Sequence, residues 1–153
     1  GPNVFKGYWR NPEKTKEEFR PDGYFITGDL GMVDERGYIN IVGRATDLII
    51  SGGFNVYPAE VEAAIDAIPG VAESAVIGLP HPDFGEGVTA VVARRADADE
   101  VSEATILAKL QGELAKFKQP KRVFFMEALP RNSMGKVQKN DLRDLFRDTF
   151  SHN

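Results

Sequence analysis

The sequence predicts an α+β fold in which a central, mostly antiparallel sheet is packed by about three helices and is preceded by a β-hairpin or short meander. Short apolar runs of strand length, bounded by turn residues, alternate with stretches whose apolar residues have helical spacing. From residue 47 onward the expected order is helix, two strands, helix, strand and helix. This order favours a compact domain whose helices pack on one sheet.

The N-terminal stretch, up to about Gly43, is rich in turns. Arg20–Gly23 and Asp34–Gly37 are both strong loop signals. Because Tyr38–Val42 alternates in polarity, it can pair with Leu30–Val33 across the second turn. We therefore predict a hairpin here, within a short β-meander.

A helix is expected to begin at Tyr57-Pro58, because proline is tolerated in the first turn of a helix. The preceding Ser51-Gly52-Gly53 loop is either a simple turn from a strand into this helix or a loop that a ligand approaches closely. The apolar residues of the helix recur on one face and are Val61, Ile65 and Ile68.

Three strands are expected further along the chain. Ser74–Leu79 and Val88–Ala93 are nearly continuous in small and β-branched apolar residues. Between them lies the polar segment His81–Gly87, which we interpret as a structural loop. Arg122–Met126 predicts the third strand.

Two more helices complete the predicted domain. Ser102 is a good N-cap for the first, which Pro120, within the segment 116–121, should end. Its apolar face consists of Ile106, Leu107, Leu110 and Leu114. The last helix should begin near Lys139, with Leu142, Leu145 and Phe146 on one face.

Composition narrows the class of protein. With 153 residues, 42% of them hydrophobic and 27% charged, the chain fits one globular domain with part of a second. It has no apolar run near the ~20 residues that cross a bilayer and no N-terminal signal pattern, so we expect a soluble, cytoplasmic protein without a membrane partner. The absence of cysteine excludes disulfides and thiol catalysis, and His81 and His152 are too isolated for a typical zinc site.

The net charge of −4 conceals a basic final third, from Lys109 onward. Such a region suits a polyanion such as a nucleotide or a coenzyme phosphate, or it is simply the solvated faces of helices. Nucleic acid is not expected as a partner, because the basic residues are dispersed among apolar positions and no motif that reads DNA or RNA accompanies them.

Four segments occur in an order and spacing that together are specific. They are Tyr24–Asp29, Gly43–Asp47, Ile50–Glu62 and Leu129–Lys136. In this arrangement the chain resembles the adenylate-forming superfamily of acyl-CoA synthetases, luciferases and peptide-synthetase adenylation domains. The resemblance covers essentially the whole chain. It implies that residues 1–46 are the distal end of a large N-terminal AMP-binding domain and that residues 47–150 are the mobile C-terminal domain.

The resemblance also implies a nucleotide site. Asp29 would hold the ribose of ATP, since a carboxylate can accept hydrogen bonds from two hydroxyl groups. Arg44 would lie beside the nucleotide at the domain junction, where its planar guanidinium suits ribose and phosphate oxygens. Without the motifs, Asp29 would be read as a turn former and Arg44 as a surface charge.

Three further roles are implied for residues of the small domain. Asp47 corresponds to the hinge, whose torsions absorb the rotation of that domain. Gly53 would border the channel for the pantetheine arm of coenzyme A. Lys136 would be the catalytic lysine, whose ammonium stabilises the charge that develops as the substrate carboxylate attacks the α-phosphate. Glu60 and Glu62 are interpreted as first-turn charges that favour the helix dipole.

The implied activity is that of an AMP-forming acid–thiol ligase. A carboxylate, ATP and coenzyme A would give an acyl-CoA, AMP and pyrophosphate through an acyl-adenylate. Mg²⁺ would arrive with ATP through the N-terminal domain, and no metal site is expected in this chain. The acyl pocket also belongs to that domain, so the chain alone is expected to be inactive. A lysine acetyltransferase and deacetylase acting on Lys136 are further expected partners, because acetylation would remove its charge.

Three runs, Gly7–Thr15, His81–Val88 and Pro130–Lys139, look most like those of malonyl-CoA synthetases. Two alternatives stay open. One is an adenylation domain that transfers its acyl group to a carrier protein, and the other is a non-catalytic α+β interaction module. A binding module would have no need of Asp29, Arg44 and Lys136 together.

Overall fold

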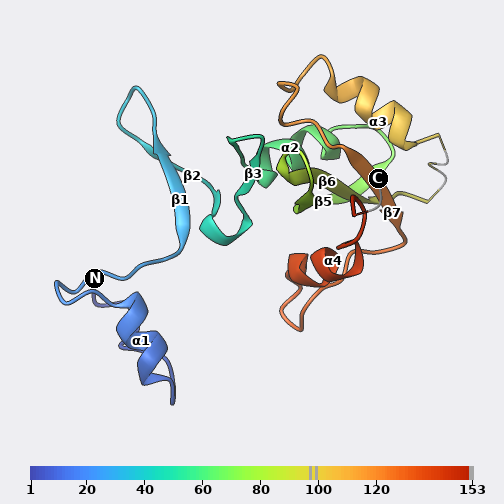
Figure 1. The fold of residues 1–153 in the computed structure, drawn as a ribbon. Coiled ribbons are helices and arrows are strands. Elements are labelled where there is room, and N and C mark those ends of the chain that lie inside the picture. Colours follow the sequence, from blue (N-terminus) through green and yellow to red (C-terminus); the bar gives the residue numbers. More distant parts are fainter. Residues whose placement is uncertain (97, 99, 152–153) are drawn as a thin grey trace.

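The computed structural model describes residues 1–96, 98 and 100–151, which contain four α-helices, seven strands and one 3₁₀ helix (Figure 1). The α-helices are α1 (Pro12–Glu18), α2 (Pro58–Asp66), α3 (Glu103–Leu110) and α4 (Lys139–Leu145), and the 3₁₀ helix is η1 (Ala45–Asp47). The strands are β1 (Asp29–Val33), β2 (Ile39–Arg44), β3 (Ile49–Ser51), β4 (Phe54–Val56), β5 (Val71–His81), β6 (Gly85–Arg94) and β7 (Arg122–Met126).

The strands form two separate sheets. The first is the antiparallel pair β1 and β2, in which Asp29 lies opposite Arg44. The second has the order β4-β3-β6-β5, and β7 pairs with β6 in parallel while the other pairs are antiparallel. The segment η1 connects the two sheets. The prediction of a mostly antiparallel α+β domain preceded by a hairpin is confirmed.

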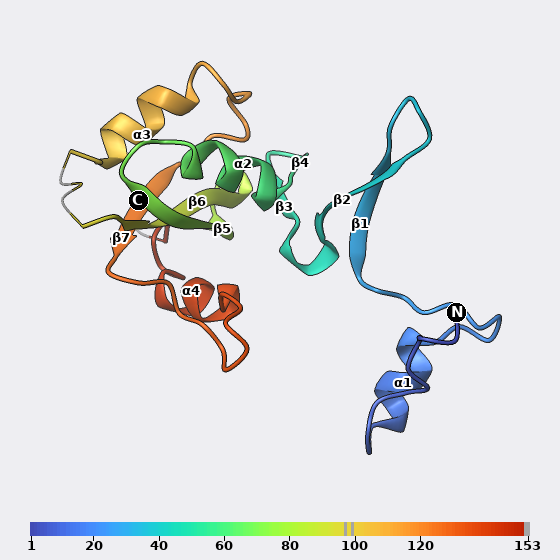
Figure 2. The same cartoon turned by 180° about the vertical axis from the view of Figure 1, so that it is seen from behind.

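The five-stranded sheet is covered on both faces. Figures 1 and 2 show α2 and α3 on one side of it and α4 on the other. Successive residues of β5 point to opposite faces, so Val76 packs with α2 and α3 while Ala75 and Ile77 pack with α4. The core on the α4 side also includes Leu142, which is fully buried. The loop between β7 and α4 is therefore joined to a rigid, well-packed sheet and helix.

Most local predictions are confirmed. Strands β1 and β2 pair across the 34–37 turn, and α2 begins at Pro58 as expected. Ser102 caps α3, and its side chain and that of Thr105 each accept a hydrogen bond from the other's backbone N–H. Strand β7 has the bounds that the sequence predicted, and α4 begins at Lys139.

Several local predictions were wrong. The N-terminal stretch contains the helix α1, for which Asn11 is the N-cap and Pro12 stands at the first helical position, a start signal that the meander interpretation overlooked. The polar segment 81–87 is largely strand, because β5 and β6 continue almost to their connecting turn. Helix α3 ends at Leu110, well before Pro120. No helix in the described part of the chain has the length and apolar character needed to cross a bilayer.

Candidate functional site

The loop that carries Lys136 is a small, internally hydrogen-bonded hairpin between β7 and α4. Its two arms meet in a bridge between Arg131 and Val137. The Asn132 side chain accepts hydrogen bonds from the backbone N–H groups of Met134 (3.0 Å) and Lys136 (2.9 Å). The backbone N–H of Asn132 donates to the Lys136 carbonyl at 2.9 Å. The backbone of Lys136 is thus held by one asparagine on both its donor and acceptor sides.

The Lys136 residue is solvent exposed. Within the part of the chain that the structure describes, its ammonium has neither an ion pair nor a hydrogen bond. Gly135, just before it, has a φ of +80°, a left-handed torsion that glycine adopts without strain. A fixed backbone with a free ammonium suits a side chain that acts on a group outside this chain.

The predicted hinge residue lies close to the segment that follows Lys136. Asp47 ends η1, and its Oδ1 is 2.9 Å from Nη2 of Arg143 on α4. Arg143 also donates to the Asn140 side chain at 2.8 Å. A pocket of about 320 Å³ is lined by Thr46, Asp47 and residues 137–140. The structure therefore brings together the hinge segment and the first turn of α4.

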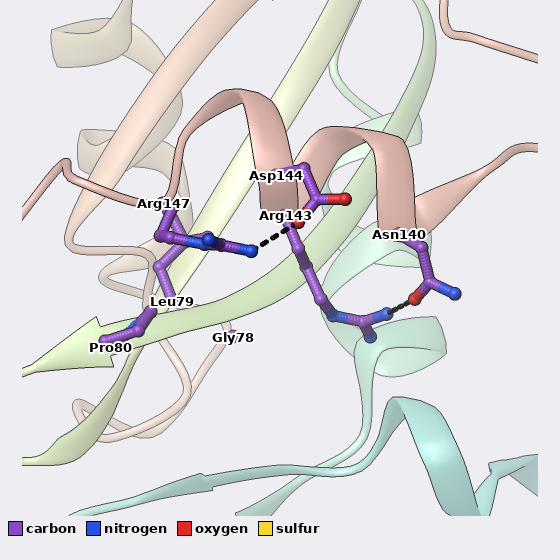
Figure 3. A pocket seen from close by; sticks show the side chains of 7 residues that line it. All are labelled: Gly78, Leu79, Pro80, Asn140, Arg143, Asp144 and Arg147. Atoms are coloured by element: carbon purple, nitrogen blue, oxygen red, sulfur yellow. Dashed lines mark hydrogen bonds and ion pairs between the residues drawn. The ribbon is translucent and has the colours of Figure 1, made fainter.

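A second pocket, of about 420 Å³, lies between α4 and the end of β5 (Figure 3). Arg143 of α4 and Arg147, in the turn after α4, extend over it, and the β5 side is formed by Gly78, Leu79 and Pro80. Both guanidinium groups already have partners, since Arg147 pairs with Asp144 at 2.7 Å and Arg143 with Asp47. We interpret it as a groove beside the hinge rather than as an anion site.

The two predicted nucleotide residues face each other across β1 and β2. Arg44 Nη1 lies 3.2 Å from Asp29 Oδ1, and the two residues form a cross-strand pair. Gly28 allows this approach, because a Cβ there would lie 3.4 Å from Arg44 Nη2 and its φ is +73°. The Arg44 side chain is exposed and that of Asp29 is partly exposed, so both groups remain accessible to a ligand.

Gly52 and Gly53 form the two-residue turn of the β3–β4 hairpin. Of the two interpretations that the sequence left open, the direct turn from a strand into α2 is therefore wrong. Their φ values are +58° and +82°, which is the torsion pattern that a tight hairpin turn demands at both positions. A Cβ on Gly53 would meet nothing within 4 Å, so this backbone is open to a ligand. The Gly-Gly pair between the short segments Ile49–Ser51 and Phe54–Val56 was the signal for this hairpin.

Glu86 and Phe84 of the β5–β6 hairpin hold the β3–β4 hairpin in place. The Ile50 N–H donates to the Glu86 carboxylate at 2.7 Å, and the Gly52 N–H donates to the Phe84 carbonyl at 2.9 Å. On its other side, Phe54 stacks on Phe117 with 4.7 Å between ring centroids. The glycine turn is thus mounted on fixed neighbours.

The predicted residues fall into three groups. Lys136 lies in the loop between β7 and α4, and Asp47 contacts α4 through Arg143, whereas Gly53 lies in the turn of the β3–β4 hairpin, which both views show apart from α4 (Figures 1 and 2). Asp29 and Arg44 lie on the separate β1–β2 sheet. Within the described residues, no hydrogen bond or ion pair joins Lys136 to Asp29, Arg44 or Gly53.

Sequence reasoning missed the ion pairs that support the lysine loop. Arg131 pairs with Glu73 of β5. Glu62 was interpreted as a helix-dipole charge, but its Oε1 lies 2.7 Å from Lys139 Nζ and also accepts from the Val76 N–H at 2.7 Å. Such pairs join residues far apart in sequence, and no local pattern could have found them. In the described residues no group of three His, Asp or Glu side chains is placed to hold a metal ion.

Comparison with known proteins identifies relatives over most of the chain. The sequence model of the AMP-binding enzyme C-terminal domain matches residues 60–136. The chain is 49% identical over 146 residues to the long-chain-fatty-acid–CoA ligase FadD13 of Mycobacterium tuberculosis. The matched region is 95% of this chain and 28% of that protein. It is 48% identical to the feruloyl-CoA synthase of an Amycolatopsis species, over 95% of this chain and 29% of that protein. The chain thus spans less than a third of these relatives.

Solved structures share the fold. ATP-bound MatB from Rhodopseudomonas palustris is 67% identical, with a TM-score of 0.88 over 98% of this chain and 30% of that one. Apo MatB has the same identity and coverage but a TM-score of 0.73. The amide bond synthetase McbA from Marinactinospora thermotolerans is 36% identical, with a TM-score of 0.85 over 95% of this chain and 30% of that one. By sequence and by fold, the chain belongs to the family of AMP-binding enzyme C-terminal domains.

Proposed function

We propose that this chain is the C-terminal part of an AMP-forming acyl-CoA synthetase. The observation that carries the proposal is the free ammonium of Lys136 on a hydrogen-bonded loop, in a chain whose curated relatives include CoA ligases along 95% of its length. A carboxylate would react with ATP to give an acyl-adenylate and pyrophosphate. The thiol of coenzyme A would then displace AMP.

In the first half-reaction, an oxygen of the substrate carboxylate bonds to the α-phosphorus, and the bond from that phosphorus to the bridging oxygen breaks. Pyrophosphate leaves. Negative charge builds up around the phosphorus, and the Lys136 ammonium stabilises it electrostatically without transferring a proton. The loop supplies the positioning, since Asn132 holds the backbone of Lys136 on both sides.

Asp29 and Arg44 form the nucleotide-binding pair in this proposal. The Asp29 carboxylate accepts from the ribose hydroxyls, and Arg44 lies beside it to contact ribose or phosphate oxygens. Their ion pair at 3.2 Å supports the assignment, because it orients the carboxylate before ATP binds. Mg²⁺ would enter with the phosphates of ATP, which commonly supply several of its ligands.

In the second half-reaction, the coenzyme A sulfur bonds to the acyl carbon, the bond between that carbon and the AMP oxygen breaks, and the thiol proton is released. We propose that the small domain rotates about Asp47 between the two steps, which removes Lys136 and brings the Gly53 turn to the acyl-adenylate. The TM-scores of 0.88 and 0.73 against the ATP-bound and apo forms of one relative support a change of arrangement within the matched region, which we assign to the junction between residues 1–46 and 47–150.

We assign malonate as the carboxylate substrate. Support comes from the three runs that resemble malonyl-CoA synthetases and from the higher identity to MatB, 67%, than to the long-chain-fatty-acid–CoA ligase, 49%. The curated relatives above are named for different substrates. The roles that we propose for residues of this chain concern ATP and the thiol arm, and none concerns the acyl group.

The shared fold extends to proteins named for other acceptors, because McbA, an amide bond synthetase, has this fold at 36% identity. A carrier-protein thiol is the alternative acceptor that the sequence left open. The open backbone at Gly53, where a Cβ would meet nothing within 4 Å, suits the thiol arm of either acceptor. Comparing coenzyme A with an acyl-carrier protein as the acceptor distinguishes the two.

Acetylation of Lys136 follows as a means of control. Its exposed side chain is accessible to a modifying enzyme, and an acetyl group would remove the charge on which adenylation depends. Full acetylation should abolish adenylation and leave thioester formation from supplied acyl-adenylate intact.

The deciding experiment uses the full-length ligase, by which we mean a protein as long as the relatives above that contains this chain. Malonate-dependent ATP–pyrophosphate exchange is compared between the native enzyme and Lys136→Ala, together with thioester formation from supplied malonyl-adenylate. Loss of exchange with retained thioester formation supports the proposal. Unchanged exchange in Lys136→Ala would contradict it and favour the non-catalytic interaction module.

A further inference from the structure

Arg131 connects the lysine loop to the central sheet through the two ends of its guanidinium group. One amino group, Nη1, donates to the carbonyl of Gly135 at 2.6 Å, and the other, Nη2, pairs with the carboxylate of Glu73 on β5. Gly135 directly precedes Lys136. The chain of contacts therefore runs from the sheet through Glu73 and Arg131 to the peptide group that carries the proposed catalytic lysine.

Glu73 is a rigid anchor for this contact. It lies where the β5–β6 register shifts, between Val71 and Glu73, an irregularity that turns a side chain away from its regular direction. The strand continues into Ala75 and Ile77, both fully buried under α4. The backbone that carries Glu73 is thus part of the packed sheet, whereas the tip of the loop is exposed.

The far end of the loop has a similar anchor. Lys139, the first residue of α4, pairs with Glu62 at 2.7 Å, and both side chains are about four-fifths buried. Glu62 in turn accepts from the N–H of Val76 in β5 at 2.7 Å. Both arms of the loop are therefore connected by a carboxylate to the same strand, while the tip at Met134 is 75% exposed.

We infer that Glu73 and Arg131 are positioning residues for Lys136, which fix the carbonyl of Gly135 and so the direction in which the lysine stem leaves the loop. The inference rests on the proposed function of Lys136. Electrostatic stabilisation of a transition state requires a preorganised charge, and small displacements of a catalytic group lower the rate steeply. A flexible four-carbon stem on an unanchored loop would not supply that.

A purely structural role predicts a different result from a positioning role. Exposed ion pairs usually add little to stability, so loss of this pair should hardly change the melting temperature. Lys136 acts only in adenylation, so a positioning defect should lower kcat of that step alone. The KM for ATP and the thioester-forming step should not change.

The test uses Glu73→Gln, Arg131→Met and the double variant in the full-length ligase. Each single variant should lower the kcat of pyrophosphate exchange by about tenfold. The double variant should be no slower than Arg131→Met, because both changes break one chain of contacts. Arg131→Lys, which keeps the charge but not the fork, should be intermediate.

The matched control is the pair of Asp144 on α4 and Arg147 in the turn that follows it, which is also an exposed arginine–carboxylate pair. Arg147→Met and Asp144→Asn should leave both half-reactions unchanged. Equal loss of both half-reactions in the Glu73 and Arg131 variants, additive effects in the double variant, or unchanged exchange would overturn the inference. If Lys136→Ala abolishes exchange while these variants do not, only the positioning role fails; if Lys136→Ala is active, the proposed function itself fails.

Discussion

Arg143 and Asp47 form an ion pair of 2.9 Å across 96 positions of the sequence, and the pair joins the proposed hinge to helix α4. Asp47 lies at the end of η1, between the two sheets, so its contacts influence how the β1–β2 sheet and the small domain are oriented. Both side chains are partly buried, and Asn140 holds the same arginine from a second side. The pair thus stabilises the present arrangement of the junction.

Arg143→Met should weaken that arrangement. The change leaves the Asp47 carboxylate partly buried without its partner, which we expect to cost about 1 kcal/mol and to lower the melting temperature by about 3 °C. Since the present arrangement resembles the ATP-bound relative more than the apo one, adenylation should slow by up to about tenfold while thioester formation does not. Calorimetry and the two half-reaction assays measure these effects.

A double-mutant cycle with Asp47→Asn shows whether the two residues act together. If they do, the second substitution adds little to the first. Fully additive effects on stability would mean that the ion pair contributes nothing at this junction.

Gly53→Ala, compared with a control glycine of similar φ, should show whether the Gly53 turn contacts the pantetheine arm or whether an added Cβ only strains the backbone. An alanine at a φ of +82° costs roughly 1 kcal/mol, although its Cβ would contact nothing within 4 Å. Gly37→Ala is the matched control, because Gly37 has a φ of +84° and an equally open Cβ position in the β1–β2 turn. Both variants should lose similar stability in thermal unfolding, and only Gly53→Ala should slow thioester formation from supplied acyl-adenylate.

Two outcomes would contradict the channel assignment. If both glycine variants slow thioester formation equally, strain alone explains the result. If neither does, the Gly53 turn does not contact the pantetheine arm.

Asp66→Asn should make the protein more stable at neutral pH. Burial raises the pKa of the Asp66 carboxyl above its ordinary value of 3.8, and the negative charges of Glu62 and Glu73 add to this, while the hydrogen bond from Ser74 opposes it. The folded state therefore binds this proton more tightly than the unfolded state, so the group's contribution to stability falls as pH rises from 3.8 through the folded-state pKa.

The asparagine variant cannot ionise and keeps an oxygen that can accept from Ser74. Its free energy of unfolding should exceed that of the native protein above this pH window, and the difference should vanish below it. Urea unfolding at a series of pH values measures the difference. A constant difference at all pH values would show that the Asp66 charge is not its cause.

The sequence predicted the elements that local patterns specify and missed those that depend on distant partners. Helix α2 begins at Pro58 and α3 is capped by Ser102, since such signals lie within a few residues. The early end of α3 at Leu110, with Gln111 as its C-cap, was missed because Pro120 was taken as the stop signal. The candidate site follows the same division. Lys136 could be singled out from its motif, whereas the Glu73 anchor is brought to Arg131 only by the fold.

Gly78→Ala should disturb the neighbourhood of the β3–β4 hairpin from within the sheet. A Cβ on Gly78 would lie 2.5 Å from Glu86 Oε1 and 3.1 Å from Ile49 Cγ2, so the carboxylate has to move. That movement weakens the hydrogen bond from the Ile50 N–H to Glu86, which is 2.7 Å long and holds β3 in place. We expect a loss of about 1–3 kcal/mol in the free energy of unfolding, because overpacking a well-packed site costs that much.

The control for this substitution is Gly112→Ala, at a glycine whose Cβ would meet no atom within 4 Å and whose φ lies outside the left-handed region. It should be neutral or slightly stabilising, since alanine restricts the unfolded chain. In the full-length ligase, Gly78→Ala should slow thioester formation more than pyrophosphate exchange, because β3 carries the Gly53 turn and lies away from the lysine loop. If exchange falls as much as thioester formation, the substitution disturbs the whole domain, and Glu86 has no special part in holding the hairpin.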